Sequence, residues 1–142
     1  MSVRTLPYCS ASYQEVSVTF TGLPCLGCAN PGHPKRFVNL EFGERLIDAL
    51  FETGEFPAGK QRPFGGISCR KCGTPVKSPV HRGGTVTGEL AFPELTAFRI
   101  TLSGPMVRCD GCGLEQIHAD RETGEKICEA MSIAFRQANV NP

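Results

Sequence analysis

SCRKCGTP (residues 68–75) and RCDGCGLE (residues 108–115) share one pattern, in which two cysteines separated by two residues are followed by glycine. A Cys-x-x-Cys turn directs two thiolates at one metal ion, and tetrahedral zinc needs about four such ligands. Gly73 and Gly113 stand where this turn favours a positive φ. The pair of motifs predicts one structural Zn²⁺ bound by the thiolates of Cys69, Cys72, Cys109 and Cys112.

These paired CxxCG motifs resemble those of zinc-ribbon proteins and, more distantly, of rubredoxins, over about residues 67–116. The resemblance is limited to the motifs and implies a β-rich site with four cysteine ligands. The long intervening segment is more similar to folds in which two such turns clamp a sheet, such as the B-type methionine sulfoxide reductases. The chain has no Trp and no cysteine that clearly matches the nucleophile of that family. Sulfur ligands also suit iron, so Fe(Cys)₄ is the alternative metal centre.

A third pair of cysteines lies in CLGCANPGH, residues 25–33. Ala29 replaces the glycine after the second cysteine, but His33 follows at a spacing similar to that of retroviral zinc knuckles, where the fourth ligand position is Val38 here. A second site would use Cys25, Cys28 and His33, with an open position or one distant ligand. Three residues could supply that ligand: Cys9, His118 and Cys128. The alternative is a reduced pair of cysteines without metal.

Charge is unevenly distributed, although the chain of 142 residues has a formal net charge of only +1. Residues 60–88 contain six Lys and Arg and no Asp or Glu. Cations with a nearby aromatic ring, here Phe64, are typical of surfaces that bind a nucleic-acid backbone. The predicted contact residues are Arg70, Lys71, Lys77 and Arg82. Alternatively, these cations compensate the −2 charge of zinc bound to four thiolates.

Hydrophobic periodicity predicts an α+β fold. Residues 16–22 alternate as in a half-buried strand, and apolar residues recur at helical spacing over 44–53 and 124–138. We expect a small antiparallel sheet with zinc-ribbon-like knuckles, two packed helices and a zinc staple. Residues 1–142 form one domain in this prediction. A weak internal similarity suggests two β–knuckle–helix units (16–53 and 96–138) around a central knuckle hairpin (66–92).

Several classes of protein are not expected from this sequence. The N-terminus has no apolar core of signal-peptide length, and no apolar run is long enough to span a bilayer. We therefore expect a cytoplasmic protein with reduced cysteines. Phosphate loops, nucleophile elbows and dinucleotide fingerprints are absent, which makes an enzyme the less favoured class.

The favoured function is a small structural-zinc module that acts as a regulatory or adaptor protein and binds another protein. The first alternative is a nucleic-acid-binding zinc-ribbon protein that uses the basic segment 60–82. The second is a zinc or thiol enzyme. An adaptor needs a contiguous apolar surface, a nucleic-acid binder a continuous positive face, and an enzyme an open zinc position or an exposed thiolate. We expect one zinc ion, or two if the third cysteine pair also binds metal.

Overall fold

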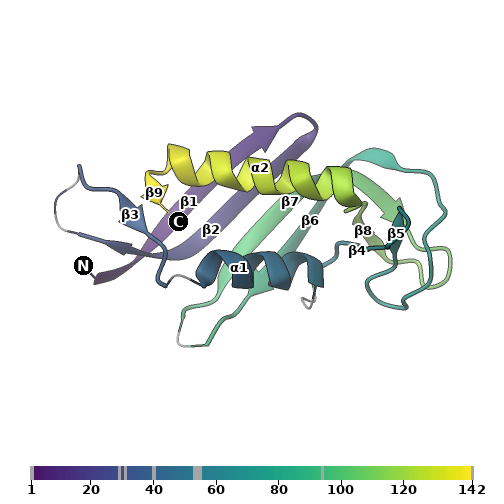
Figure 1. Ribbon diagram of the computed structural model, residues 1–142, viewed down its shortest axis with the longest axis horizontal. Helices are drawn as coiled ribbons and strands as arrows, with labels where there is room; N and C mark the ends of the chain where they lie inside the picture. The colour runs from purple at the N-terminus through teal and green to yellow at the C-terminus, as the bar shows by residue number, and fades with distance from the viewer. Residues whose placement is uncertain are drawn as a thin grey trace.

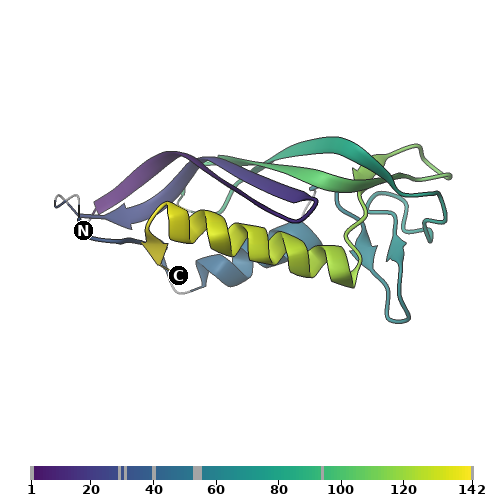
Figure 2. The same ribbon diagram turned by 90° about the horizontal axis from the view of Figure 1, so that it is seen from above.

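The computed structural model describes residues 2–28, 30, 32–39, 41–52, 56–93 and 95–141. Its four long strands form an antiparallel sheet in the order β6 (His81–Leu90), β7 (Phe98–Arg108), β2 (Val16–Gly27) and β1 (Ser2–Tyr13). Both helices lie on one face of this sheet (Figures 1 and 2). The predicted α+β class is confirmed. Three short strands extend the sheet: β3 (Lys35–Arg36), β8 (Glu115–Ile117) and β9 (Val140–Asn141).

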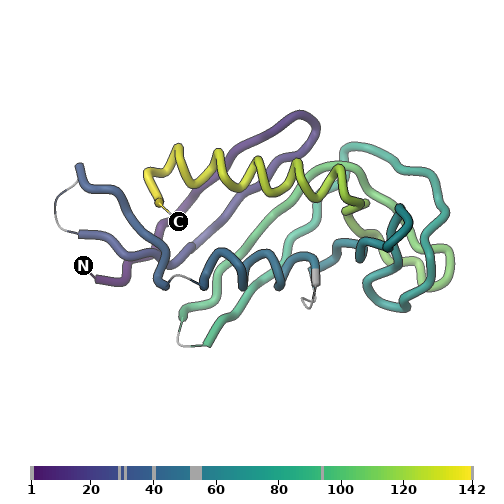
Figure 3. Tube along the Cα trace, viewed as in Figure 1, coloured from purple at the N-terminus to yellow at the C-terminus, as the bar shows by residue number. Residues whose placement is uncertain are grey.

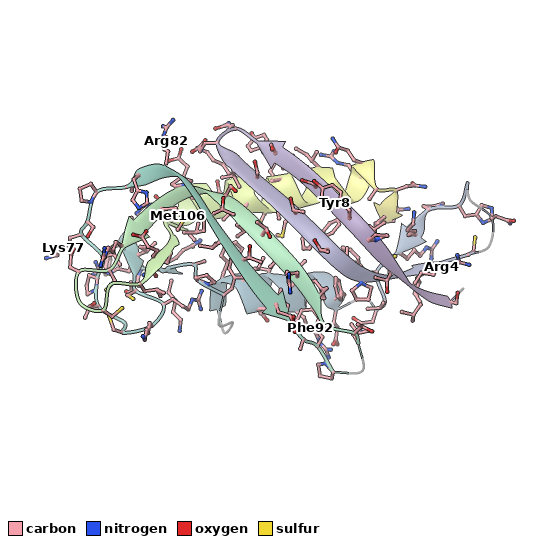
Figure 4. All side chains as sticks on the ribbon, turned by 180° about the vertical axis from the view of Figure 1, so that it is seen from behind. Arg4, Tyr8, Lys77, Arg82, Phe92 and Met106 are labelled. Atoms are coloured by element: carbon pink, nitrogen blue, oxygen red, sulfur yellow. The ribbon has the colours of Figure 1, made fainter. Side chains whose placement is uncertain are left out.

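Alternation along the strands separates a buried face from an open one. In the central strands, Val18 and Phe20 lie opposite Leu102 and Ile100, and all four are fully buried beneath the helices. The residues between them point to the other face, which no helix covers (Figure 4). That face is lined with hydroxyl groups that hydrogen-bond across strand pairs, in Ser10–Thr19, Ser12–Ser17, Thr85–Ser103 and Thr87–Thr101.

Helix α2 (Arg121–Gln137) covers β1 and β2. It begins three residues before the predicted 124–138, because Asp120 is the N-cap and its carboxylate accepts a hydrogen bond from the backbone N–H of Thr123 at 2.9 Å. The ring of Phe135 stacks on that of Phe20, with centroids 5.1 Å apart. This contact fixes the helix over the centre of the sheet.

Helix α1 (Phe42–Ile47) continues as one π-helical stretch, η1 (Asp48–Glu52), so the predicted helix over 44–53 starts two residues earlier than expected. Phe42, Leu46 and Leu50 are fully buried. Helices α1 and α2 run alongside each other (Figure 3) on the same side of the sheet (Figure 2).

One end of the molecule projects beyond the helices (Figures 1 and 2). We call its residues 60–80 and 107–116 the zinc lobe, after the zinc ion that the sequence predicts there. It contains the small hairpin of β4 (Lys60–Gln61) and β5 (Ile67–Ser68), and most of β8. Strands β5 and β6 lie within the predicted central hairpin (66–92), but β5 pairs with β4 and β6 pairs with β7, so the two do not form a hairpin with each other. Residues 75–80 form no strand and contribute only an isolated bridge between Ser68 and Pro75.

The two proposed units, 16–53 and 96–138, meet at the centre of the sheet. Strands β2 and β7 are neighbours, and Thr19 lies directly opposite Thr101. Each strand leads from a hairpin towards a helix on the same face. This arrangement is compatible with a duplication, which stays a prediction. Within the described residues, no helix is long and apolar enough to cross a membrane.

Candidate metal centre

The two CxxCG turns bring four sulfur atoms together at the tip of the zinc lobe. The ligand atoms of Cys69, Cys72, Cys109 and Cys112 all lie within 4.8 Å of one another. The Cys69–Cys112 and Cys72–Cys109 sulfur pairs are each 3.5 Å apart. Tetrahedral zinc with sulfur at about 2.3 Å requires sulfur separations of about 3.8 Å. The four-cysteine cluster therefore fits a single metal ion of this class.

Both turns have the same backbone hydrogen bonds. The N–H of Gly73 donates to the carbonyl of Cys69 at 3.0 Å, and that of Gly113 donates to the carbonyl of Cys109 at 2.8 Å. The two glycines have φ of 78° and 76°, in the left-handed region that disfavours side chains. The predicted reason for glycine at these positions is confirmed.

Gln116, which was not among the predicted site residues, hydrogen-bonds to the first CxxCG turn. This side chain is fully buried, and its amide nitrogen donates to the Cys69 sulfur at 3.3 Å. Its oxygen accepts a hydrogen bond from the backbone N–H of Arg70 at 2.9 Å. A buried amide that bonds both a ligand sulfur and its turn orients that ligand. The available signal for this role in the sequence was a polar residue in the short strand after the second motif.

Proton affinities within the cluster are unequal. Desolvation raises the pKa of Cys69, but hydrogen bonds from the backbone N–H of Cys72 and from Gln116 outweigh it and lower the pKa to about 6. A backbone hydrogen bond from Cys112 lowers the pKa of Cys109. A backbone hydrogen bond from Leu114 lowers the pKa of Cys112, but desolvation and contacts with the other three thiols together outweigh it and raise the pKa to about 11. Metal binding at neutral pH would therefore release protons, among them the proton of Cys112.

The four predicted contact cations do not form one surface. The Arg70 guanidinium donates to the backbone carbonyls of Ala58 (2.7 Å), Leu50 (3.1 Å) and Phe51 (2.9 Å), which ties the first CxxCG turn to the end of η1. Lys77 lies at the far end of the lobe, whereas Arg82 lies at the edge of the sheet (Figure 4). Lys71 is exposed at the tip of the first turn.

Exposed cations instead gather at a hollow of about 550 Å³ beside the first turn, which we call the cationic hollow. Lys60, Arg62 and Lys71 line it with exposed side chains, and Arg70 contributes to its wall. Among the lining residues that the structure describes, none is Asp or Glu. Lys60 and Arg62 belong to the predicted basic segment 60–82 but were not among the predicted contact residues.

The third cysteine pair does not form a turn of the same kind. Cys25 lies within β2 and is fully buried, whereas Cys28 follows the end of that strand. Three residues of extended chain span about 10 Å. The Cys28 sulfur lies 3.0 Å from Nδ1 of His33. In the described part of the chain, the four-cysteine cluster is the one group of three or more possible ligands. Cys28 and His33 are thus the members of the predicted second site that lie together.

The three candidate completing ligands have other surroundings. Cys9 is buried under α2 and its thiol donates to the carbonyl of Ala134 at 3.1 Å. Desolvation raises the pKa of both Cys9 and Cys128. His118 lies 3.8 Å from a carboxylate oxygen of Asp120.

Comparison of the chain with protein-family models, curated proteins and solved structures finds no match.

Proposed function

We propose that this chain is a metal-stapled module, with zinc as the metal, that acts as an adaptor by binding an amphipathic segment of another protein. The observation that carries this proposal is an apolar hollow of about 360 Å³ between α1 and α2. A second hollow of about 450 Å³ adjoins it and shares Ile47 and Cys128 as lining residues. We call the two together the helix groove. Its apolar lining comprises Phe37, Leu46, Ile47, Phe51, Met131 and Phe135.

Charge at the rim indicates the chemistry of the partner. Among the described residues that line the helix groove, three are acidic (Glu44, Glu125 and Glu129) and one is a cation, Arg121, which lies 3.8 Å from a carboxylate oxygen of Glu125. An amphipathic helix that lays its apolar side chains into such a groove fits best when Lys or Arg flank that face. The proposed partner is therefore a helical segment with an apolar stripe and basic flanks.

The two alternative functions have less support from this geometry. A nucleic-acid backbone would need a continuous positive face, but Arg70 is engaged with backbone carbonyls and Lys77 is separated from Arg82. A metal ion bound by all four cysteines would have no open position for a substrate. The helix groove, with Ile47 exposed in it, is the observation that favours the adaptor hypothesis over these two.

Fluorescence anisotropy with two designed peptides tests the proposal. Both peptides carry leucines at helical spacing, and they differ only in having Lys or Glu on their flanks. We expect the Lys peptide to bind at least tenfold more tightly than the Glu peptide, because the rim is acidic. Ile47→Ser should weaken binding of the Lys peptide by about tenfold, since one buried apolar side chain contributes about 1.5–3 kcal/mol.

Val80→Ser is the matched control. Val80 is 47% exposed and Ile47 is 41% exposed, but Val80 lies in the zinc lobe, outside the helix groove. Binding of the Lys peptide should be unchanged in this variant. Equal effects of the two substitutions, or equal binding of the two peptides, would contradict the proposed groove.

A further inference from the structure

We propose that the cationic hollow is a binding site for a phosphate monoester, either free or at the end of an oligonucleotide. This site is separate from the helix groove and goes beyond the adaptor function. It lies between the β4–β5 hairpin and the first CxxCG turn, and three exposed cations, Lys60, Arg62 and Lys71, converge on it.

Local structure places these cations on the same side. Lys60 and Arg62 are two residues apart around β4, so their side chains point in one direction along an extended chain. Gln61 between them points towards α2, where its amide lies 3.5 Å from the carbonyl of Asp120. Ser68 pairs directly with Lys60 across the hairpin and adds a hydroxyl to the lining. Two strand residues and the tip of the turn thus surround one hollow.

The charge balance favours a doubly charged anion. The three exposed cations, Lys60, Arg62 and Lys71, contribute +3, and the described lining residues include no Asp or Glu, so the hollow carries an excess of positive charge. The two acids of the zinc lobe are engaged on the other turn, Asp110 with Ser78 and Glu115 with His81. A phosphate monoester carries about −1.5 to −2 at neutral pH and matches that excess.

The compactness of the cluster distinguishes one phosphate group from a nucleic-acid backbone. Lys77 and Arg82 do not line the hollow and lie apart from each other (Figure 4), so the cations do not continue as a track. Next to Pro63 of the lining, the ring of Phe64 is 103% exposed. An exposed ring offers a stacking surface for a base that adjoins a terminal phosphate.

Binding of short labelled oligonucleotides to the metal-loaded full chain tests this site. One oligonucleotide carries a 5′-phosphate and the other a 5′-hydroxyl of the same sequence. We expect the 5′-phosphate to increase affinity at least tenfold, and inorganic phosphate to compete. The double variant Lys60→Ala/Arg62→Ala should lose at least tenfold in affinity. Metal content and circular dichroism of each variant establish that the fold is intact.

The matched control removes two cations from outside the hollow, in the double variant Lys77→Ala/Arg82→Ala. Its affinity should stay within twofold of the unmodified protein. Phe64→Ala should weaken binding of the oligonucleotide but not of inorganic phosphate, which separates the two sources of the phosphate group. Equal loss in both double variants, equal binding of the two oligonucleotides, or no competition by phosphate would each overturn the proposal. Failure of the helix-groove peptides would leave this site unaffected.

Discussion

The sheet with its two helices and the zinc lobe are built on different physical principles. The first has a continuous hydrophobic core that includes Phe20, Phe42 and Phe135. In the zinc lobe only Ile67, Cys69, Val107, Cys109 and Gln116 are buried among the described residues, and none belongs to that core. Apolar burial therefore stabilises one region, whereas we expect the other to depend on a metal ion bound by its four thiolates. One chain can hence lose structure in one region while retaining it in the other.

Cys109→Ser should have the largest effect of the substitutions considered, because it should unfold one region and leave the other folded. Structural zinc supplies folding free energy on the order of 10 kcal/mol in small zinc peptides. Loss of one ligand should therefore abolish stoichiometric zinc and unfold the zinc lobe, while α2 keeps its helical structure. Elemental analysis measures the metal, and hydrogen exchange with mass spectrometry compares residues 60–80 with residues 121–137.

Cys28→Ser is the control for this experiment, because Cys28 lies outside the four-cysteine cluster. It should keep one zinc ion and the exchange protection of the lobe. If Cys109→Ser left the lobe protected, or if the lobe of the unmodified protein stayed protected after the metal was removed, the contrast between the two regions would be wrong.

Arg70→Ala should have a smaller effect, because Arg70 joins the two regions. Hydrogen bonds that involve a charged group contribute about 1.5–3 kcal/mol. Loss of the three bonds to Ala58, Leu50 and Phe51 should lower the free energy of unfolding by about 3 kcal/mol and leave zinc stoichiometry unchanged. Urea unfolding, followed by circular dichroism, measures the change. Lys71→Ala, which removes the exposed neighbouring cation, should be nearly silent; an equal loss would indicate a general charge effect.

The metal cluster could be predicted from the sequence because the residues that determine each of its turns are close together in the chain. Two cysteines and a glycine within five residues determine each turn, as the matching φ values of Gly73 and Gly113 confirm. The roles of Gln116 and Arg70 were not predictable in the same way. Their partners lie up to 47 residues away in the chain, and only the fold brings them together.

Secondary structure was predictable where apolar periodicity is strong and was missed where it is weak. The alternation around Val18 and the helical pattern around Met131 correspond to β2 and α2. Strand β1 was not predicted, since SVRTLPYCSASY contains Pro7 and mostly exposed or half-buried residues on an edge of the sheet. Cys25 and Cys28 were expected to form a turn, but β2 continues through Cys25 to Gly27.

Cys9→Ala, which tests the hydrophobic region, should have the smallest effect of the substitutions considered. Cys9 is buried, but its acceptor, the carbonyl of Ala134, also accepts a hydrogen bond from the N–H of Ala138 at 3.0 Å. Removal of the thiol therefore leaves that carbonyl with a partner, and we expect a loss of about 1 kcal/mol in the free energy of unfolding at pH 7. Zinc stoichiometry should not change.

The loss of unfolding free energy caused by Cys9→Ala should depend on pH. Burial of the Cys9 thiol determines the direction of that dependence. Desolvation raises the pKa of Cys9 above its ordinary value of 9.0, so the fold favours the protonated thiol. The stability associated with this group is fully present below pH 9.0 and is lost as the pH rises through the raised pKa of the folded state. Urea unfolding at several pH values should therefore show the unmodified protein losing its advantage over the variant above about pH 9, since the other titrating groups are common to both. A difference that grew with pH would instead mean that the thiolate is stabilised in the fold, and Cys9 would then belong with the metal-binding cysteines.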